Sequence, residues 1–313
     1  MRHLCRLPQA PRTLQDTDAY KRLDDDGKRN AYQLDGNVYT LPYAAEWYGI
    51  IANRAILERY VAKDYAVIDS PDDITDYDTL ERVTQSIDEH REDLGVDAAF
   101  STPASNPPTL PLHLAHVATA AVLRIPRPQH HPQPAHRRQV PGRLPDHVRF
   151  ELHHCATVPS MVAGRNYEQV TAEFARGKAV CYPNGVWSYT QIKDDAVKDD
   201  DLMMLPYYMG IEGEEHYGPA GIYDASWAVN RNASTKDKEA TLAFISWLVT
   251  DDQARTILSK DMGFAVPFTT FDDDYQPDNP SLREPAPTPP TACPKCAASR
   301  CPTRNGRMTS PTP

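Results

Sequence analysis

The chain has 313 residues, of which 33 are Lys or Arg and 43 are Asp or Glu, so its formal net charge is −10. The basic charge is concentrated in segments without helical or strand periodicity, which disfavours nucleic acid as a partner. No apolar run reaches the roughly 18 residues that a membrane-spanning helix requires, so the sequence predicts no transmembrane segment. Helical and strand patterns alternate in residues 14–102 and 166–279, which predicts a soluble α/β protein.

Residues 103–165 interrupt this pattern, since they hold seven Arg and no Lys, eight of the 11 His and 11 of the 29 Pro. Neither helical nor strand periodicity is sustained there, and so long a structureless loop is unusual inside a compact domain. Three interpretations are a His-rich metal-binding tract, a basic arm for nucleic acid and a disordered insertion. We favour a fourth, translation of a GC-rich region out of frame, because such a region yields Arg, Pro, His and Ala without Lys.

Residues 280–313 hold nine Pro and three of the six Cys, and we expect them to be a disordered tail that follows a second change of frame. Their cysteines, Cys293, Cys296 and Cys301, resemble part of a zinc knuckle. A structural zinc ion needs four ligands, however, and no His or further Cys follows within reach. We therefore expect neither a metal site nor any other cofactor.

The most informative segment begins with an extended run that ends at Pro42, because proline cannot donate a backbone hydrogen bond. Aromatic rings and one carboxylate follow it closely: Tyr43, Glu46, Trp47 and Tyr48. Flat rings stack on the C–H faces of pyranose sugars, and a carboxylate accepts hydrogen bonds from sugar hydroxyls. The alternative is that these rings are core residues beside a strand. A helical pattern then starts near Ile56.

A second segment follows an amphipathic helix that stops at Gly177. Residues 179–182 predict a short buried strand, and residues 183–185 (Pro-Asn-Gly) predict a turn. The turn delivers Trp187 and Tyr189, which an alternating backbone would place on one side. An aromatic pair in this position is typical of a carbohydrate platform.

A third segment begins with Ser234 and Asp237, whose spacing is similar to a capping box at a helix start. Four apolar residues share one face of this helix and are expected in the core: Ala240, Phe244, Trp247 and Leu248. Asp251 predicts the start of another helix. Trp227, at the beginning of a strand, fits a binding site and a core position equally well.

Together these segments resemble bacterial extracellular solute-binding protein family 1, the sugar-binding, maltose-binding-protein-like components of ABC importers. The family's hinge segment is similar to LPYAAEWYGIIANRAIL, which begins at Leu41. Its helix–strand–turn unit is similar to FARGKAVCYPNGVW, which begins at Phe174. Its late helices are similar to SWAVNRNASTKDKEATLAFISWLVTDDQARTI, which begins at Ser226. The resemblance covers about residues 35–100 and 166–279.

The resemblance implies an α/β fold with two lobes of the type II periplasmic-binding-protein kind, in which crossing strands act as a hinge. It assigns residues 1–37 to a poorly matched remnant of the first lobe and 38–43 to a hinge strand. Residues 44–215 form the second lobe, interrupted by 103–165, and 216–279 return through the hinge to the helices of the first lobe. Much of the first lobe is expected to be missing, so this copy would be truncated and its binding impaired.

Residue by residue, the resemblance implies that Glu46 accepts hydrogen bonds from sugar hydroxyls. It implies that Trp187 is the tryptophan that stacks on the sugar ring. Tyr43, Trp47, Tyr48 and Trp227 are further ligand-binding candidates. The implied partners are a small-molecule carbohydrate and the transmembrane permease subunits of the importer, and the protein is expected to be a monomer. Family members are extracellular or periplasmic, often anchored by lipid, whereas no signal peptide is visible in this chain.

Catalysis is not expected. A glycosidase needs two carboxylates about 5–10 Å apart, and Glu46 is the sole carboxylate among the clustered aromatic residues. Motifs for a nucleophile elbow, a zinc protease, a P-loop and dinucleotide binding are absent from the sequence. Two alternatives to a sugar-binding protein remain, the non-functional product of a damaged gene and a carbohydrate-active hydrolase.

Overall fold

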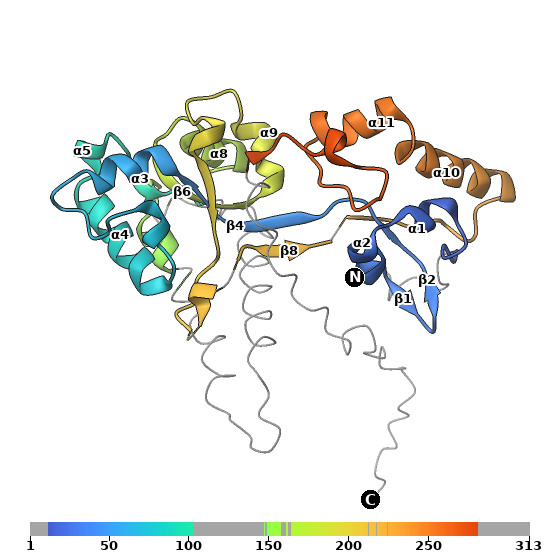
Figure 1. The fold of residues 1–313 in the computed structure, drawn as a ribbon. Helices are drawn as coiled ribbons and strands as arrows, with labels where there is room; N and C mark the ends of the chain where they lie inside the picture. The colour runs from blue at the N-terminus through green and yellow to red at the C-terminus, as the bar shows by residue number, and fades with distance from the viewer. Residues whose placement is uncertain are drawn as a thin grey trace, which may run out of the picture.

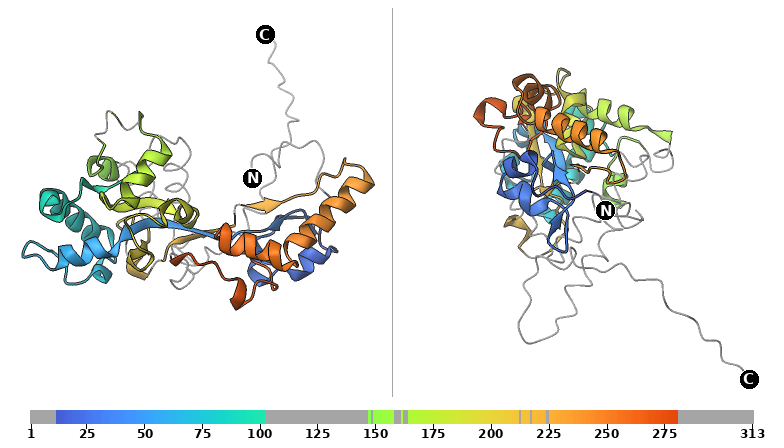
Figure 2. Two further views of the ribbon diagram at one scale, coloured as in Figure 1. Left: turned by 90° about the horizontal axis from the view of Figure 1, so that it is seen from above. Right: turned by 90° about the vertical axis from the view of Figure 1, so that its right-hand side faces the viewer.

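The structure is a computed structural model that describes residues 12–102, 147, 149–157, 161, 164–211, 213–216, 218–223 and 225–280. The described residues form two lobes that lie side by side (Figure 1). Strand β4 (Glu46–Asn53) runs from one lobe into the other, and β8 (Ala220–Ile222) lies along its beginning. The view from above shows the same two bodies on either side of these strands (Figure 2).

The first lobe, dark blue and orange in Figure 1, is built from both ends of the described chain. Its elements are α1 (Asp18–Arg22), α2 (Asp25–Asn30), β1 (Gln33–Leu34), β2 (Asn37–Val38), β3 (Leu41–Pro42), β9 (Ser226–Trp227), α10 (Thr235–Leu248) and α11 (Asp252–Thr256). The second lobe contains β4, α3 (Arg54–Val61), α4 (Tyr77–Glu89), α5 (Arg91–Leu94), β5 (Ala98–Phe100), α8 (Tyr167–Ala175), β6 (Ala179–Gly185), α9 (Tyr189–Ile192) and β7 (Leu202–Leu205).

A five-stranded sheet forms the centre of the second lobe, in the order β5-β6-β4-β7 with β8 paired to β4. Only β5 and β6 are parallel, and β4 is antiparallel to all its neighbours. Tyr48 of β4 lies opposite Gly185 of β6 and also opposite Ala220 of β8, so these two strands flank β4 on opposite edges. Glu46 lies beyond the end of β6, where β4 approaches the first lobe.

Alternate residues of β4 contribute to separate hydrophobic clusters, as the two-residue period of a strand requires. Tyr48, Ile50 and Ala52 pack with α3 and α4, whereas Ile51 packs with α8 and α9. The second lobe therefore has helices on both faces of its sheet.

The first lobe has a core of its own, to which both ends of the described chain contribute. Leu14, Leu23 and Leu41 pack there with Ile245 of α10 and with Val249, which follows that helix. Because α1 and α2 are short and the sheets β1-β2 and β3-β9 have two strands each, contacts between these distant segments hold the lobe together.

Sequence signals for helix ends are confirmed. The Ser234 side chain accepts a hydrogen bond from the amide of Asp237 at the start of α10, and Asp251 accepts one from the amide of Ala254 at the start of α11. Gly177, after α8, has φ of +67°, the left-handed conformation that favours glycine.

The predicted turn at residues 183–185 is wrong, because these residues extend β6. Pro183 lies opposite Ile50, and Gly185 lies opposite Tyr48. The partner strand β5 accompanies β6 only as far as Cys181. Pro183 therefore has a neighbouring strand on one side alone, which is where a sheet tolerates proline.

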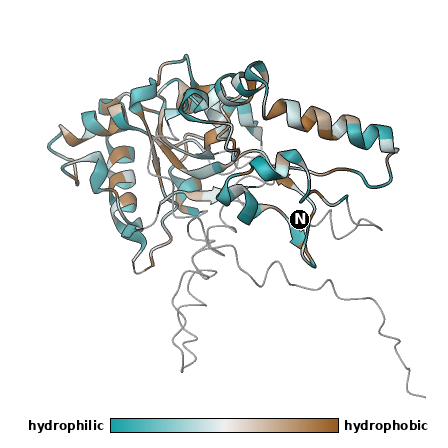
Figure 3. Cartoon of the chain, turned by 45° about the vertical axis from the view of Figure 1, so that its right-hand side comes forward, coloured by the Kyte–Doolittle hydropathy of each residue, from teal (hydrophilic) through white to brown (hydrophobic). Residues whose placement is uncertain are grey.

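The expected core face of α10 is wrong for Ala240, Phe244 and Trp247, which are exposed, whereas Leu248 is partly buried against the first-lobe core. Phe244 is 56% exposed and Trp247 is 42% exposed. The helix instead buries Ile245 and partly buries Leu242 against the first-lobe core. Coloured by hydropathy, α10 is a helix of mixed hydrophobic and hydrophilic residues (Figure 3).

The strand that joins the lobes lies later in the chain than the sequence predicted. Val38 and Leu41, expected in the hinge strand, belong to the first-lobe core, and β4 makes the crossing. Pairing of β8 with β4 places residues 220–222 beside it, within the predicted hinge return.

Most of residues 103–165 and 280–313, including the predicted out-of-frame segments and the three late cysteines, lie outside the described residues. In the described part, residues 149–153 are helical although no periodicity predicted an element there. Phe150 enters the core beside Phe100, with ring centroids 5.6 Å apart, and Cys155 forms a parallel bridge to Phe100. This short segment adds to the second-lobe sheet and core.

Candidate functional site

Glu46 begins β4, at the point where the strand leaves the first lobe. Since side chains alternate along a strand, Glu46 points to the same face as Tyr48. Tyr48 is only 1% exposed and packs in the core on that face. Glu46 itself is half-buried, so its carboxylate lies at the edge of the core.

Trp187 lies just beyond the end of β6, in a 3-10 turn formed by Val186–Ser188. Its ring centroid is 6.5 Å from that of Tyr48, and it packs against the same cluster. A β-carbon on Gly185 would lie 2.1 Å from the indole, so the ring occupies space that only glycine leaves open. The structure thus brings together Glu46, Tyr48 and Trp187 on one face of the sheet.

Two side-chain hydrogen bonds, one from a neighbouring residue and one from a distant residue, fix the backbone around Trp187. Ser188 Oγ donates to the carbonyl of Gly185 at 2.8 Å. Asn279 Nδ2 donates to the carbonyl of Val186 at 2.9 Å and is itself almost fully buried. Sequence reasoning missed both, and Asn279 carried no local signal because it lies 93 residues away.

A buried polar network supports the last part of β6. The Asn184 Nδ2 group donates to the hydroxyls of Tyr182 and Tyr167, at 2.5 and 3.0 Å. The Tyr182 hydroxyl also lies 2.6 Å from Thr171 Oγ1 of α8. Burial raises the pKa of Tyr182 well above its ordinary value, so the hydroxyl stays protonated. This network fixes α8 to the strand that leads into Trp187.

Tyr43 and Trp227 form a separate aromatic pair on the first-lobe side. Their rings are stacked, with centroids 4.7 Å apart and planes 15° apart. The amide of Tyr43 donates to the carbonyl of Ala225 at 3.1 Å, which holds the two segments in register. Phe264 and Phe268 pack against the pair at tilted angles. One face of each ring is therefore already covered by the other.

Trp47 and Tyr189 lie apart from Glu46. Trp47 points to the opposite face of β4, where it packs against the cluster under α8 and α9. Tyr189 is buried in that cluster, and its hydroxyl donates to Asp199 Oδ2 at 2.8 Å. The predicted placement of Trp187 and Tyr189 on one side is wrong, because residues 186–192 are helical and do not alternate.

The described ranges contain no group of three or more His, Cys, Asp or Glu side chains that could hold a metal ion. Asp24 accepts a hydrogen bond from the amide of Gly27 and caps α2, while Asp272 accepts one from the amide of Asp274. These acidic residues serve local backbone structure. In the part of the chain that the structure describes, every helix is too short or too polar to cross a bilayer.

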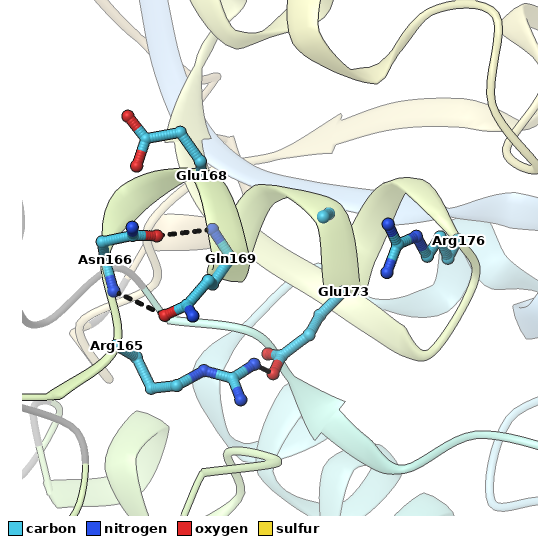
Figure 4. Close-up of a pocket in the computed structure, with 7 residues that line it drawn as sticks. Arg165, Asn166, Glu168, Gln169, Glu173 and Arg176 are labelled. Atoms are coloured by element: carbon cyan, nitrogen blue, oxygen red, sulfur yellow. Dashed lines mark hydrogen bonds and ion pairs between the residues drawn. The ribbon is translucent and has the colours of Figure 1, made fainter.

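An open hollow of about 330 Å³ lies elsewhere, along the outer surface of α8 (Figure 4). Arg165 and Glu173 form an ion pair across it, and Asn166 and Gln169 exchange hydrogen bonds at the start of the helix. No sequence-predicted site residue lines this hollow. The hollow is open and its lining contains no aromatic ring, so we place the candidate site at Glu46 and Trp187 instead.

The family described as bacterial extracellular solute-binding protein matches residues 6–281. A sequence search of curated proteins finds no significant match.

Solved structures of similar fold include RafE in complex with raffinose, at 19% identity and a TM-score of 0.57 over 83% of this chain. Maltose-bound MalE3 from T. maritima matches 85% of the chain at 16% identity with a TM-score of 0.59. A sugar transporter from Bacillus licheniformis in complex with stachyose matches 83% at 16% identity with a TM-score of 0.58.

These structures confirm the predicted two-lobed periplasmic-binding-protein fold. The present chain spans 64% of the length of each of the three.

Proposed function

Because the chain belongs to the bacterial extracellular solute-binding protein family, we propose that it captures a sugar or oligosaccharide between its two lobes and presents it to the permease subunits of an ABC importer. The ligands named for three structures of similar fold, raffinose, maltose and stachyose, support a carbohydrate. No catalytic step is part of this proposal.

One observation carries the proposal: Glu46 and Trp187, far apart in sequence, gather on the same face of β4. Tyr48 is near both: it follows Glu46 by two residues on the same strand, and its ring centroid is 6.5 Å from that of Trp187. Residues two apart on a strand are about 7 Å apart, so the acceptor and the aromatic platform both lie near Tyr48, at a spacing that suits neighbouring units of an oligosaccharide. That combination suits a ligand with both C–H faces and hydroxyl groups.

Each residue has a distinct role in this proposal. The Trp187 indole offers a flat apolar face to the C–H groups of a pyranose ring. The carboxylate of Glu46 accepts hydrogen bonds from sugar hydroxyls, and bonds to a charged group are stronger than neutral ones. Tyr48, being buried, supports Trp187 from beneath.

The stacked pair of Tyr43 and Trp227 supplies the ligand contacts that the first lobe makes in this proposal. Each ring has at most one face left, so the pair acts as a single platform. Since β4 crosses between the lobes, bending at its ends would bring this platform toward Trp187. A ligand that contacts both lobes stabilises the closed arrangement, which is the state a permease would recognise.

Titration calorimetry of the full chain with raffinose, maltose and stachyose tests the proposal. Trp187→Ala should weaken the binding free energy by about 1–3 kcal/mol, because it removes one stacking platform. Trp247→Ala is the matched control, since this tryptophan lies on α10 in the first lobe. Equal affinity of the two variants, compared at equal folded fraction, would exclude Trp187 from the site. Absence of binding to any oligosaccharide would overturn the sugar assignment.

A further inference from the structure

The end of the described chain contacts both lobes. Tyr275 packs partly against the first-lobe core, and its hydroxyl donates to Asp252 Oδ1 of α11 at 3.2 Å. Asp278 Oδ1 lies 2.9 Å from Lys260 Nζ, in the helical segment that follows α11 in the first lobe. These contacts attach the segment to the first lobe up to Asp278. We call residues 275–279 the strap.

Asn279, the last residue of the strap, contacts the second lobe instead. Its Nδ2 atom donates to the carbonyl of Val186 at 2.9 Å, and the residue is only 1% exposed. Val186 belongs to the cluster under α8 and α9, and the next residue is Trp187. Figure 1 shows the end of the described chain, in orange-red, beside α9. Because separating the partners would leave buried polar groups unsatisfied, this contact stabilises the described arrangement of the lobes.

The strap lies where the two lobes approach each other. A β-carbon built on Gly263 would lie 4.0 Å from Thr190 Cγ2 of α9. Gly263 comes three residues after Lys260, so the part of the first lobe that holds the strap is itself close to α9. The strap therefore adds a connection between the lobes to those made by β4 and β8.

Little slack separates the two attachments of the strap. Asp278 and Asn279 are consecutive residues, whose Cα atoms are about 3.8 Å apart. An N–H···O hydrogen bond spans about 2.7–3.2 Å, so a shift of one lobe by about 1 Å breaks one attachment unless the backbone at the other moves with it. Motion of the first lobe is thereby transmitted to the Val186 carbonyl.

We propose that Asn279 is a positioning residue, which couples the arrangement of the two lobes to the direction of the Trp187 ring. The Val186 carbonyl belongs to the planar peptide unit that precedes Trp187, so its orientation sets where the indole starts. Holding this unit from the first lobe orders the platform before a ligand arrives, and such preorganisation lowers the cost of binding. The coupling itself needs no ligand, whereas its effect on affinity rests on the proposed sugar function.

Near-UV circular dichroism of the full chain without ligand tests the coupling, because this signal depends on fixed packing around aromatic rings. The difference between each chain and its Trp187→Phe counterpart isolates the Trp187 signal. Asn279→Ala should reduce that signal. Asn30→Ala is the matched control and should leave it unchanged, because Asn30 Nδ2 also donates to a backbone carbonyl at 2.9 Å, that of Asp26 within α2.

Lys260→Ala tests whether the first lobe takes part. It removes the pair with Asp278, a contact between two residues on the first-lobe side. The Trp187 signal should fall in the wild-type background and should not fall further in the Asn279→Ala background, where the strap no longer reaches the turn. Far-UV circular dichroism confirms that each variant is folded.

Titration calorimetry with raffinose, maltose and stachyose measures the effect on the site. Asn279→Ala should bind about twofold to tenfold more weakly than the wild-type chain, the range that one hydrogen bond gives. Asn30→Ala should bind as the wild-type chain does.

Four results would overturn the proposal. An unchanged Trp187 signal in Asn279→Ala means that the bond does not position the ring. An equal loss in Asn30→Ala means that the signal follows general stability. A wild-type signal in Lys260→Ala means that Asn279 acts without the first lobe. Unchanged sugar affinity in Asn279→Ala means that the coupling does not reach the site. A wild-type chain that binds none of the three sugars would overturn the proposed function, while the spectra would still decide the coupling.

Discussion

The indole of Trp187 occupies the position that a side chain on Gly185 would need, since a β-carbon built there lies 2.1 Å from the ring. Gly185 has φ of −113°, so its backbone needs no glycine, and its role is to leave space. Ser188 and Asn279 hold the adjoining carbonyls in place. The direction of Trp187, and hence its value as a platform, depends on this close approach.

Gly185→Ala should therefore displace Trp187 and weaken sugar binding about as much as Trp187→Ala does, by roughly 1–3 kcal/mol. The extra methyl group cannot coexist with the present ring position. Titration calorimetry gives the affinity, and near-UV circular dichroism reports the movement of the indole. Gly164→Ala is the control, because a β-carbon there meets no atom within 4 Å. Wild-type affinity in Gly185→Ala would mean that the position of Trp187 is unimportant for binding.

Glu46→Gln should lower affinity for oligosaccharides while leaving the fold intact. The amide keeps the shape of the carboxylate but loses its charge, and a hydrogen bond to a charged group contributes about 1.5–3 kcal/mol. Calorimetry at one fixed pH measures the change. Glu58→Gln, at an exposed position on α3, makes the same replacement away from the site and should have no effect. Equal affinity of both variants with the wild-type chain would remove Glu46 from the site.

How far the sequence predicts this structure depends on whether the decisive contacts are local. Ser234, Asp251 and Gly177 were assigned correctly, because helix ends depend on a few neighbouring residues. Pro183 was misassigned, since its compatibility with a strand follows from where β5 ends. No local sequence pattern could show that β5 pairs with β6 only as far as Cys181.

In the candidate site, too, features set by neighbouring residues were predicted and features set by distant contacts were not. The resemblance singled out Glu46 and Trp187 separately, but their placement on one face rests on the register that sets Tyr48 opposite Gly185. Trp47 lies on the other face because one residue along a strand reverses the direction of a side chain. For α10, helical spacing identified an apolar face but could not tell which side the lobe would cover. Phe244 was consequently assigned to the core although it is exposed.

Glu151→Leu should stabilise the second lobe. Glu151 is 0% exposed, and neither carboxylate oxygen has a hydrogen-bond partner within the described residues. His147 Nε2 lies 3.1 Å from Glu151 Oε1 without hydrogen-bond geometry, so this buried pair is poorly compensated. A charge buried without hydrogen bonds is costly, so its removal should raise the free energy of unfolding; replacing a whole buried ion pair by packed apolar residues often gains about 1–4 kcal/mol, which sets the upper bound here.

Urea unfolding measures the effect of Glu151→Leu on the free energy of unfolding. Glu92→Leu, at an exposed position on α5, is the control and should lie within about 0.5 kcal/mol of the wild-type chain. A loss of stability in Glu151→Leu would show that the pair with His147 is a net stabilising contact, contrary to this prediction.

Cys181 should report the opening of the second-lobe sheet. It lies in β6 between Ala52 of β4 and Phe100 of β5, and burial, followed by the charge of Glu151, raises its pKa from 9.0 to about 12. The thiolate is the reactive form, so the folded chain should label far more slowly than the unfolded chain with a thiol reagent at neutral pH. Mass spectrometry of the peptide that contains Cys181 separates its labelling from that of other cysteines.

The same shift gives a pH dependence with a definite sign. Because the folded state holds the Cys181 proton more tightly, this group contributes stability that is fully present below pH 9 and is lost as the pH rises through about 12. Over that window its contribution should fall by up to about 1.4 kcal/mol per pH unit. Cys181→Ala removes this contribution, so its unfolding free energy should decline less steeply with pH than that of the wild-type chain. Urea unfolding at several pH values measures both slopes. Parallel slopes, together with rapid labelling of the folded chain, would show that β6 is already open to solvent at Cys181.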